Sequence, residues 1–457
     1  HMPNTSPPVV DVRSLQEKKA VVGRKAVTDY GLFAAVTAGI NARMLAPLVV
    51  GFKLFMGSTT GNILLDDDDE MIPAVKDVLA TGRRMSVHAE DDHLIAKGEE
   101  HCCRDHLRNR PAKAETEAIS RLAAAFPRGS INICHVTTPE GLDIARSAGF
   151  TTEVTMHHLL FEADRFSGAE YKVNPPIRDI GTRDALYRRF AAGDFDMIGT
   201  DHAPHTAEEK ARPFDEAPSG IPGVETTIPI MMEMVRRGDL RLSEIVRMAS
   251  SNPGRLFGVP KGVIAPGYDA DFAVFDMRAS SKVDVRSLHS RCGHSPYAGY
   301  DAVFPQDVYV RGSLQVCDGE FCGEPIGRDV RGLRYRLFRD CRQSDRMPAR
   351  MRNVLPLSAR GPSGRAPVLQ EELSRIARQI ARPGCLYGAR SEEGQGILRL
   401  PERQKMLDIC EPSHILQTVP VPHLLQRQDP GRARSLVQRC MDRQGFRCHG
   451  GGAHARS

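Results

Sequence analysis

The feature that most constrains the fold is a pattern repeated through residues 30–260. A short apolar run, rich in β-branched residues, ends in polar residues and is followed by a helix-like stretch. Strands that alternate with helices in this way indicate parallel strands and an α/β fold. The predicted strands are Pro47–Met56, Arg84–Glu90, Ser130–Val136, Phe150–His158 and Phe195–His205. The helix-like stretches include Glu115–Phe126, Pro139–Ala148 and Thr182–Ala192.

Four side chains with metal-binding or proton-transfer chemistry lie in these runs, toward or just after their C-terminal ends: Lys53, His88, His135 and Asp201. Their successive spacings of 35, 47 and 66 residues fit one or two strand–helix units each. In a barrel of parallel strands these ends converge on the face that carries the catalytic groups. One buried histidine is more often a hydrogen-bonded core residue, but several at matching strand ends favour a shared site.

These residue types suit the metal-assisted hydrolysis of an amide. A divalent metal activates a water molecule and polarises the carbonyl, and neutral imidazoles and carboxylates are suitable zinc ligands. His88 and His135 are the candidate imidazoles, while Asp201 is both a candidate ligand and a candidate proton carrier. A buried ammonium at Lys53 is costly. Carbamylation by carbon dioxide removes that cost and makes an anion able to bridge two metals.

The sequence changes in character twice. From about Pro260, short alternating strands and glycine turns, as in Gly262–Phe275 and Asp307–Val316, predict a small β-sandwich. Residues 331–457 contain 23 Arg and one Lys against 11 acidic residues, a balance of +13, whereas residues 1–330 carry −8. We therefore predict three parts: a barrel over 1–259, a partial β-sandwich over 260–330, and an Arg-rich tail over 331–457.

The tail has several interpretations. We favour a segment that is disordered or that derives from a frameshift in a GC-rich gene. An Arg-rich extension that binds nucleic acid is an alternative, since arginine neutralises phosphate. It is less favoured because aromatic residues are sparse and the basic residues are dispersed. An ordinary helical appendage remains open.

The overall composition, with 41% hydrophobic and 26% charged residues, is typical of a soluble enzyme. No apolar run approaches the roughly 18 to 20 residues that cross a bilayer. No secretory pattern is present at the N-terminus, so we predict a cytoplasmic protein without a membrane partner. The 11 cysteines are scattered, which favours free thiols.

A set of motifs, taken in order, resembles the dihydroorotases, which are cyclic amidohydrolases of the amidohydrolase superfamily. The resemblance covers roughly residues 2–325. The motifs are MPNTSPP (Met2–Pro8), GFKLFMGSTTG (Gly51–Gly61), VHAED (Val87–Asp91), ICHV (Ile133–Val136), EVTMHHL (Glu153–Leu159), KVNPPIR (Lys172–Arg178), GTDHAPHT (Gly199–Thr206), SGIPGVET (Ser219–Thr226), NPGRLFG (Asn252–Gly258) and GYDADFAVFD (Gly267–Asp276).

The resemblance implies a deformed (β/α)8 TIM-like barrel that hydrolyses dihydroorotate reversibly to N-carbamoyl-aspartate in pyrimidine synthesis. By motif match, Lys53 is the carbamylated ligand that bridges up to two zinc ions, and His88 and His135 hold the second ion. Asp201 binds the first ion and acts as general base and then acid. A homodimer is a further expectation.

The resemblance also implies a set of substrate-binding residues. Asn4, Asn174 and His205 match positions that hold the substrate carboxylate or ring. Backbone groups around Gly220 and Gly223 would contact the edge of the pyrimidine ring. The adjacent histidines His157 and His158 are interpreted as structural.

The chain departs from the family pattern at its start. The family has a strand with a His-x-His pair and a nearby Arg well upstream of the MPNT motif, and here the chain begins at that motif. We therefore expect an N-terminally truncated barrel that lacks its first strand, a partial β-sandwich, and impaired or absent activity. An incomplete barrel is expected to leave two unpaired strand edges.

Two other functions remain open. The chain is alternatively another cyclic amidase, an allantoinase or a dihydropyrimidinase. MPNT, KVNPPIR and TDHAPH favour a dihydroorotase, because they place amides and an imidazole where a substrate carboxylate would lie. A non-catalytic, dihydroorotase-like scaffold is the third hypothesis. The presence of all four candidate ligands argues against it, since a scaffold does not need them.

Overall fold

Residues 1–59 and 63–331 are described by a computed structural model of the chain, and six parallel strands form its main sheet. Their order in the sheet is their order in the sequence, and each pairs in parallel with the next. This is the strand order of a (β/α)8 barrel. The strands are β1 (Phe33–Ala35), β2 (Gly51–Phe55), β3 (Met85–His88), β4 (Ile131–Ile133), β5 (Thr151–Thr155) and β6 (Met197–Gly199).

The predicted α/β barrel class is confirmed, and the barrel is incomplete within the described residues. The parallel sheet has six strands. An eight-stranded barrel without its first strand would have seven, so the described sheet has one strand fewer than predicted. Strand β2 shows why these runs form inner strands, because all five of its residues are buried. Near-continuous apolar sequence is typical of parallel strands that are covered on both faces.

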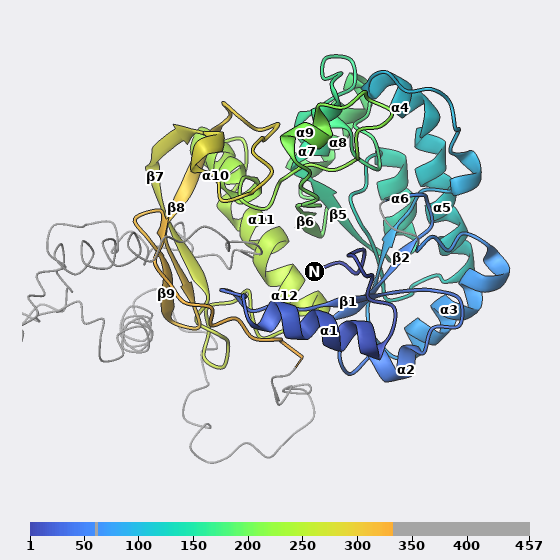
Figure 1. The fold of residues 1–457 in the computed structure, drawn as a ribbon, viewed down its shortest axis with the longest axis horizontal. Helices are drawn as coiled ribbons and strands as arrows, with labels where there is room; N and C mark the ends of the chain where they lie inside the picture. Colours follow the sequence, from blue (N-terminus) through green and yellow to red (C-terminus); the bar gives the residue numbers. More distant parts are fainter. Residues whose placement is uncertain (60–62, 332–457) are drawn as a thin grey trace, which may run out of the picture. The chain divides into compact units, whose positions relative to one another are not determined.

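Helices cover the outer face of this sheet (Figure 1). In α3 the buried residues Met71, Val75 and Val78 recur at helical spacing and face the core. The helices that follow the strands are α2 (Ala42–Leu45), α3 (Asp68–Ala80), η1 (Asp92–Leu94), α4 (Cys103–Asn109), α5 (Ala112–Ala125), α6 (Pro139–Ser147), α7 (Met156–Leu160), η2 (Ala169–Tyr171), α8 (Ile180–Ala191) and α9 (Ala207–Lys210).

The free edge of β1 is partly covered by the start of the chain. The backbone N–H of Phe33 donates to His1 O at 3.0 Å, and that of Ala35 donates to Val9 O at 2.8 Å. Helix α1 (Val12–Gly23) follows this segment and begins with a capping box between Asp11 and Ser14. The sequence predicts unpaired strand edges. At the edge of β1, however, two backbone N–H groups form hydrogen bonds with the start of the chain.

A second sheet is antiparallel and has the order β10–β9–β8–β7. Helix α10 packs against β8 and β7, with its residues Ile228 to Met234 buried (Figure 1). The residues that predicted a small β-sandwich thus contribute paired strands, while the domain boundaries at 259 and 330 stay predictions. These elements are α10 (Thr227–Arg237), α11 (Leu242–Val246), η3 (Arg247–Ser251), α12 (Asn252–Phe257), β7 (Phe272–Lys282), η4 (Val285–Ser287), β8 (Asp301–Val310), β9 (Ser313–Cys317) and β10 (Glu320–Phe321).

The Arg-rich tail predicted over 331–457 lies, after Arg331, outside the described residues. Among the helices of the described part, none has the length and apolar character that a bilayer-spanning segment requires.

Candidate functional site

Three of the four candidate ligands lie at or just after the C-terminal ends of strands in the parallel sheet, and the fourth, Lys53, is the middle residue of β2. His88 is the last residue of β3, while His135 and Asp201 each follow the end of a strand by two residues. The register pairs Phe55 of β2 with His88 of β3. Because side chains alternate along a strand, Lys53 projects from the same face as Phe55, and therefore as His88.

One ring nitrogen of His88 faces one ring nitrogen of His135. His88 Nδ1 lies 3.2 Å from His135 Nε2, and both side chains are buried. The other ring nitrogen of His88, Nε2, lies 2.9 Å from Glu90 Oε2. Since a carboxylate only accepts, Nε2 of His88 carries the proton and its Nδ1 offers a lone pair. Burial lowers the pKa of both imidazoles, which favours the neutral form that metals bind.

The charge of Lys53 reaches the other three side chains. Burial is the largest effect on the pKa of His88, of His135 and of Asp201, and the charge of Lys53 adds a lowering contribution at each of them. Lys53 therefore lies within electrostatic range of the other three side chains. Asp201 is exposed by surface area, yet enough protein surrounds it for desolvation to raise the pKa of its carboxyl against the opposing effect of Lys53. Lys53 itself is buried, at 3% exposure. Their roles as ligands remain predictions.

The backbone is strained at two of these four positions. His135 has φ +37° and Asp201 has φ +41°, in the left-handed region that side chains other than glycine seldom adopt. Such conformations cost on the order of 1–3 kcal/mol and concentrate at functional sites. Both residues follow the end of a strand, and the periodicity of the sequence does not report these backbone angles.

Two carboxylates beside this group were not singled out from the sequence. Burial opposes ionisation of Glu90, but Arg110, at 2.6 Å, and His88 outweigh it and hold the pKa of Glu90 below its usual range. Glu153, on β5, accepts hydrogen bonds from Asn132 and from the backbone of His135, and burial raises its pKa to about 7. Both lie inside quoted motifs, VHAED and EVTMHHL, where an acidic residue in an apolar run was the available signal.

The predicted substrate-binding residues gather from three segments. Ser219 joins two of them, because its hydroxyl donates to Asn174 Oδ1 at 3.3 Å and its carbonyl lies 3.2 Å from His205 Nε2. A Cβ at Gly220 would lie 3.1 Å from the ring of His205 and 2.4 Å from Ala203 O, so a side chain there would clash.

Gly223 and Asn4 complete the predicted substrate set. The backbone N–H of Gly223 donates to His202 Nδ1 at 3.1 Å, which ties its loop to the segment after β6. Asn4 lies instead in the segment that runs beside β1, and within the described residues it makes no hydrogen bond to the other four.

The adjacent histidines of α7 differ from each other. His158 is fully engaged, because Nδ1 lies 2.7 Å from Thr155 Oγ1 and Nε2 lies 2.9 Å from Pro175 O. His157 is equally buried, but neither of its ring nitrogens has a hydrogen-bond partner among the described residues. Hydrogen bonds therefore support the predicted structural role of His158, but they do not support that of His157.

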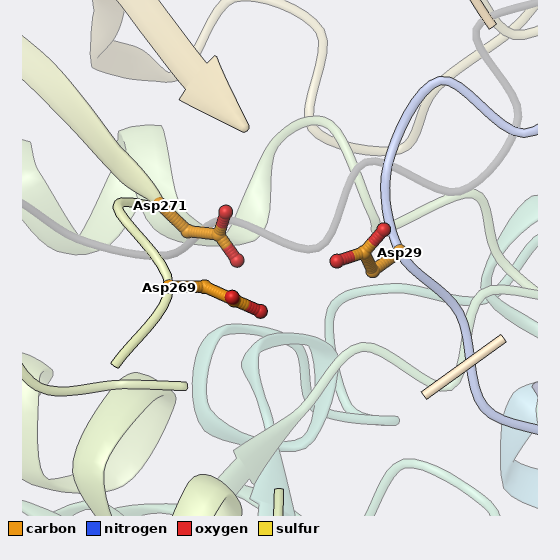
Figure 2. Close-up of side chains that lie close together, drawn as sticks. All are labelled: Asp29, Asp269 and Asp271. Atoms are coloured by element: carbon orange, nitrogen blue, oxygen red, sulfur yellow. The ribbon is translucent and has the colours of Figure 1, made fainter. Parts of the chain in front are cut away.

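A separate group of carboxylates, Asp29, Asp269 and Asp271, has the spacing of a metal site. Figure 2 shows Asp29 facing the other two across a small gap. The ammonium of Lys261 contacts all three, at 2.8 Å from Asp29, at 2.9 Å from Asp269 and closer still to Asp271. Arg311 also pairs with Asp29. The charge that a metal ion would supply is thus already supplied by side chains, and we interpret this group as structural.

Comparisons with known proteins place these features in context. Residues 67–312 match the model of the amidohydrolase family. A dihydroorotase of Thermoplasma volcanium is 35% identical over 340 residues, which cover 72% of this chain and 77% of that protein. A dihydroorotase of Halobacterium salinarum is also 35% identical, over 72% of this chain and 80% of its own length.

Solved structures give a similar result. An L-hydantoinase (dihydropyrimidinase) from Arthrobacter aurescens superimposes with a TM-score of 0.67 at 26% identity, over 72% of this chain and 79% of that one. A dihydropyrimidinase from Brevibacillus agri gives a TM-score of 0.64 at 26% identity, over 70% and 76% of the two chains.

Proposed function

Because the chain belongs to the amidohydrolase family, we propose that its site performs the dihydroorotase reaction, the reversible hydrolysis of the cyclic amide of dihydroorotate to N-carbamoyl-aspartate. The observation that carries the proposal is the pair of facing nitrogens, His88 Nδ1 and His135 Nε2, 3.2 Å apart beside Lys53 and Asp201. The names of the relatives support the choice of substrate. Pyrimidine synthesis in the cytoplasm is the cellular role that this reaction would serve.

The donor set fits zinc. Two buried neutral imidazoles bring one ring nitrogen each to one point, a carboxylate lies within electrostatic range, and Nδ1 of His135 has no partner among the described residues. Lys53 fits the bridging role once its amine nitrogen bonds to the carbon of carbon dioxide and loses one proton, because the product is an anionic carbamate. Bound zinc would polarise the amide carbonyl and lower the pKa of a water molecule to roughly 7.

The residues of this chain then have separate tasks. Asp201 accepts the proton of the attacking water and passes it to the amide nitrogen as the ring C–N bond breaks. Glu90 fixes the tautomer of His88, so that Nδ1 and not Nε2 faces the metal position. Asn174, His205 and the loop of Gly220 and Gly223 hold the substrate beside Asp201, with Asn4 a further predicted contact.

The test is a direct assay of dihydroorotate hydrolysis by the full chain after loading with zinc. We expect one tightly held zinc on His88, His135 and Lys53. The Asp201→Ala variant should keep that zinc and lose turnover. Turnover by this variant near the parent level would contradict the proton-transfer role. A parent with zinc bound that hydrolyses dihydrouracil or hydantoin faster than dihydroorotate would contradict the proposed substrate.

A second candidate activity is that of a dihydropyrimidinase, or of an allantoinase. The resemblance of the fold to hydantoinases favours it. The two activities are separated by substrate, since dihydrouracil and hydantoin lack the carboxylate of dihydroorotate. Faster hydrolysis of either would favour the second candidate. A chain that takes up no zinc from supplemented medium would instead support a non-catalytic scaffold.

A further inference from the structure

His106 lies on α4, away from the four candidate ligands, and it is 4% exposed. Its Nδ1 is 2.9 Å from both carboxylate oxygens of Glu100. Its Nε2 is 3.0 Å from the backbone oxygen of Val173 and 2.8 Å from the side-chain oxygen of Asn174. A buried imidazole is thus held between a carboxylate and one of the predicted substrate-binding residues.

The partners of His106 determine where its protons are. The carbonyl of Val173 only accepts, so Nε2 carries a proton. Burial opposes ionisation of Glu100, but hydrogen bonds from His106 and Asn109 and the charge of Lys172 outweigh it and lower its pKa to about 2. Glu100 is therefore an acceptor at neutral pH, and it holds the Nδ1 side of the ring while Nε2 donates on the other side.

This protonation state fixes the orientation of the Asn174 amide. A carboxamide has an accepting end and a donating end that look alike in shape, and its neighbours decide which end faces them. The proton on His106 Nε2 requires the oxygen of Asn174, and the hydroxyl of Ser219 donates to the same oxygen at 3.3 Å. The amide nitrogen is left without a hydrogen bond to the described residues, so it is the end available to a ligand.

The same network holds the loop that contains Gly220. Lys172 pairs with Glu100 at 3.4 Å, and its Nζ donates to Phe214 O at 2.7 Å. Its backbone oxygen accepts from Gly220 N at 2.8 Å. Glu100 thereby connects α4 to two of the segments that carry predicted substrate contacts.

We propose that His106, held at Nδ1 by Glu100 and donating from Nε2, is a positioning residue that turns Asn174 so that only its NH2 group faces the substrate. The substrate group that it selects is an oxygen acceptor, such as the carboxylate or a ring carbonyl. The proposal rests on the proposed function for the identity of the substrate. The contact of His106 with Asn174 and the orientation of that amide do not depend on it.

The kinetic test compares His106→Leu, which removes the donor, with His106→Gln, whose amide can still donate to Asn174. His101→Leu is the matched control, because His101 precedes the same helix but its side chain is 77% exposed. For dihydroorotate we expect His106→Leu to raise KM about tenfold with kcat within about twofold, the effect of one lost substrate hydrogen bond. His106→Gln should recover most of this loss. A KM for His106→Leu equal to that of the His101→Leu control overturns the proposal.

A second measurement does not depend on turnover. Nitrogen-15 NMR of the histidine rings, with the His106 signals identified from their loss in His106→Gln, should show an N–H group at Nε2 of His106. The side-chain amide signals of Asn174 should shift in His106→Leu and not in His101→Leu.

The kinetic and NMR measurements together distinguish a failure of the positioning role of His106 from a failure of the proposed function. A bare Nε2 on His106 in the parent, or Asn174 signals that do not respond to His106, overturns the positioning role whatever the activity. A parent that hydrolyses dihydrouracil or hydantoin faster than dihydroorotate removes the proposed function, and the NMR result still decides the role of His106. If His106→Leu fails to fold, the Nε2 proton in the parent still tests the proposal.

Discussion

At the scale of single residues, the site depends on partners that set proton positions. His88 shows this most directly, because a proton on Nε2, held by Glu90, leaves a lone pair on Nδ1 toward His135. Glu90 is itself kept ionised by Arg110, which is 20 residues distant in the sequence. The sequence predicted His88 and His135 as ligands, but the two residues that orient His88 come from different elements, and their pairing required the structure.

We predict that Glu90→Gln weakens zinc binding without unfolding the chain. The substitution keeps the shape but removes the charge that favours one tautomer of His88. Loss of such a partner typically lowers metal affinity about 10- to 100-fold. Competition with a chromophoric chelator measures this. Glu99→Gln is the control, since that side chain is 92% exposed, and equal zinc affinity in the two variants would contradict the orienting role.

A pH dependence of stability follows from His158. Burial lowers its pKa from 6.5 to about 4 in the folded chain. Between these two values the unfolded chain binds a proton that the folded chain does not, so this contribution is complete above pH 6.5 and is lost as the pH falls through 4. For one such group the slope approaches about 1.4 kcal/mol per pH unit.

We therefore expect the free energy of unfolding of His158→Gln to fall less steeply than that of the parent between pH 6.5 and 4. Urea denaturation at several pH values gives both slopes. His93→Gln replaces an exposed histidine and should keep the parent slope. A His158→Gln slope indistinguishable from the parent slope would show that His158 does not carry this dependence.

At the scale of elements, the sequence predicts the order of the parallel strands better than their extent. The run Phe195–His205 predicts one strand, but β6 covers Met197–Gly199, and the chain turns at Asp201 with a positive φ. Periodicity locates a buried strand, but it does not report the backbone angle at which the strand ends. The contribution of Glu153 was missed for a related reason, since its partners lie on neighbouring strands and not near it in the sequence.

Helix α3 permits a test at this scale. Asp67 is its N-cap and accepts from Asp69 N at 2.8 Å, and three acidic residues lie in the first turn. The run of four aspartates, Asp66–Asp69, thus spans the start of this helix. Replacing Asp67 by Ala should lower the free energy of unfolding by about 0.5–2 kcal/mol, the usual value of such a cap. Asp66→Ala, one residue before the cap, should change it less, and equal losses would contradict this assignment.

At the scale of the whole described chain, the Asp29, Asp269, Asp271 and Lys261 group connects distant parts of the sequence. Asp29 precedes β1, Lys261 follows α12, and Asp271 directly precedes β7. Arg311, in the turn after β8, adds a second positive charge to Asp29. Asp269 and Asp271 belong to the GYDADFAVFD motif, but the position of Asp29 beside them is set by the fold and could not be predicted from the sequence.

We predict that Lys261→Met destabilises the chain by about 3–5 kcal/mol, because it leaves mutually repelling carboxylates without their buried counter-charge. Calcium should recover part of this loss in the variant, since the freed oxygens then have a cation to bind, and should not stabilise the parent. Lys282→Met is the control, because Lys282 is 66% exposed and its ion pair should contribute at most about 1 kcal/mol. Calcium stabilisation of the parent itself would show instead that this group binds metal.

The ammonium of Lys261 also has a consequence for how the molecule responds to chelators. A chelator cannot remove the ammonium of Lys261, because it is covalently part of the chain, whereas it could remove an ion held by His88 and His135 as proposed. Dialysis against EDTA should therefore abolish activity and leave the ion pairs of this junction in place. The protein would then be recoverable by adding back the ion, with no refolding step between the inert and the competent forms.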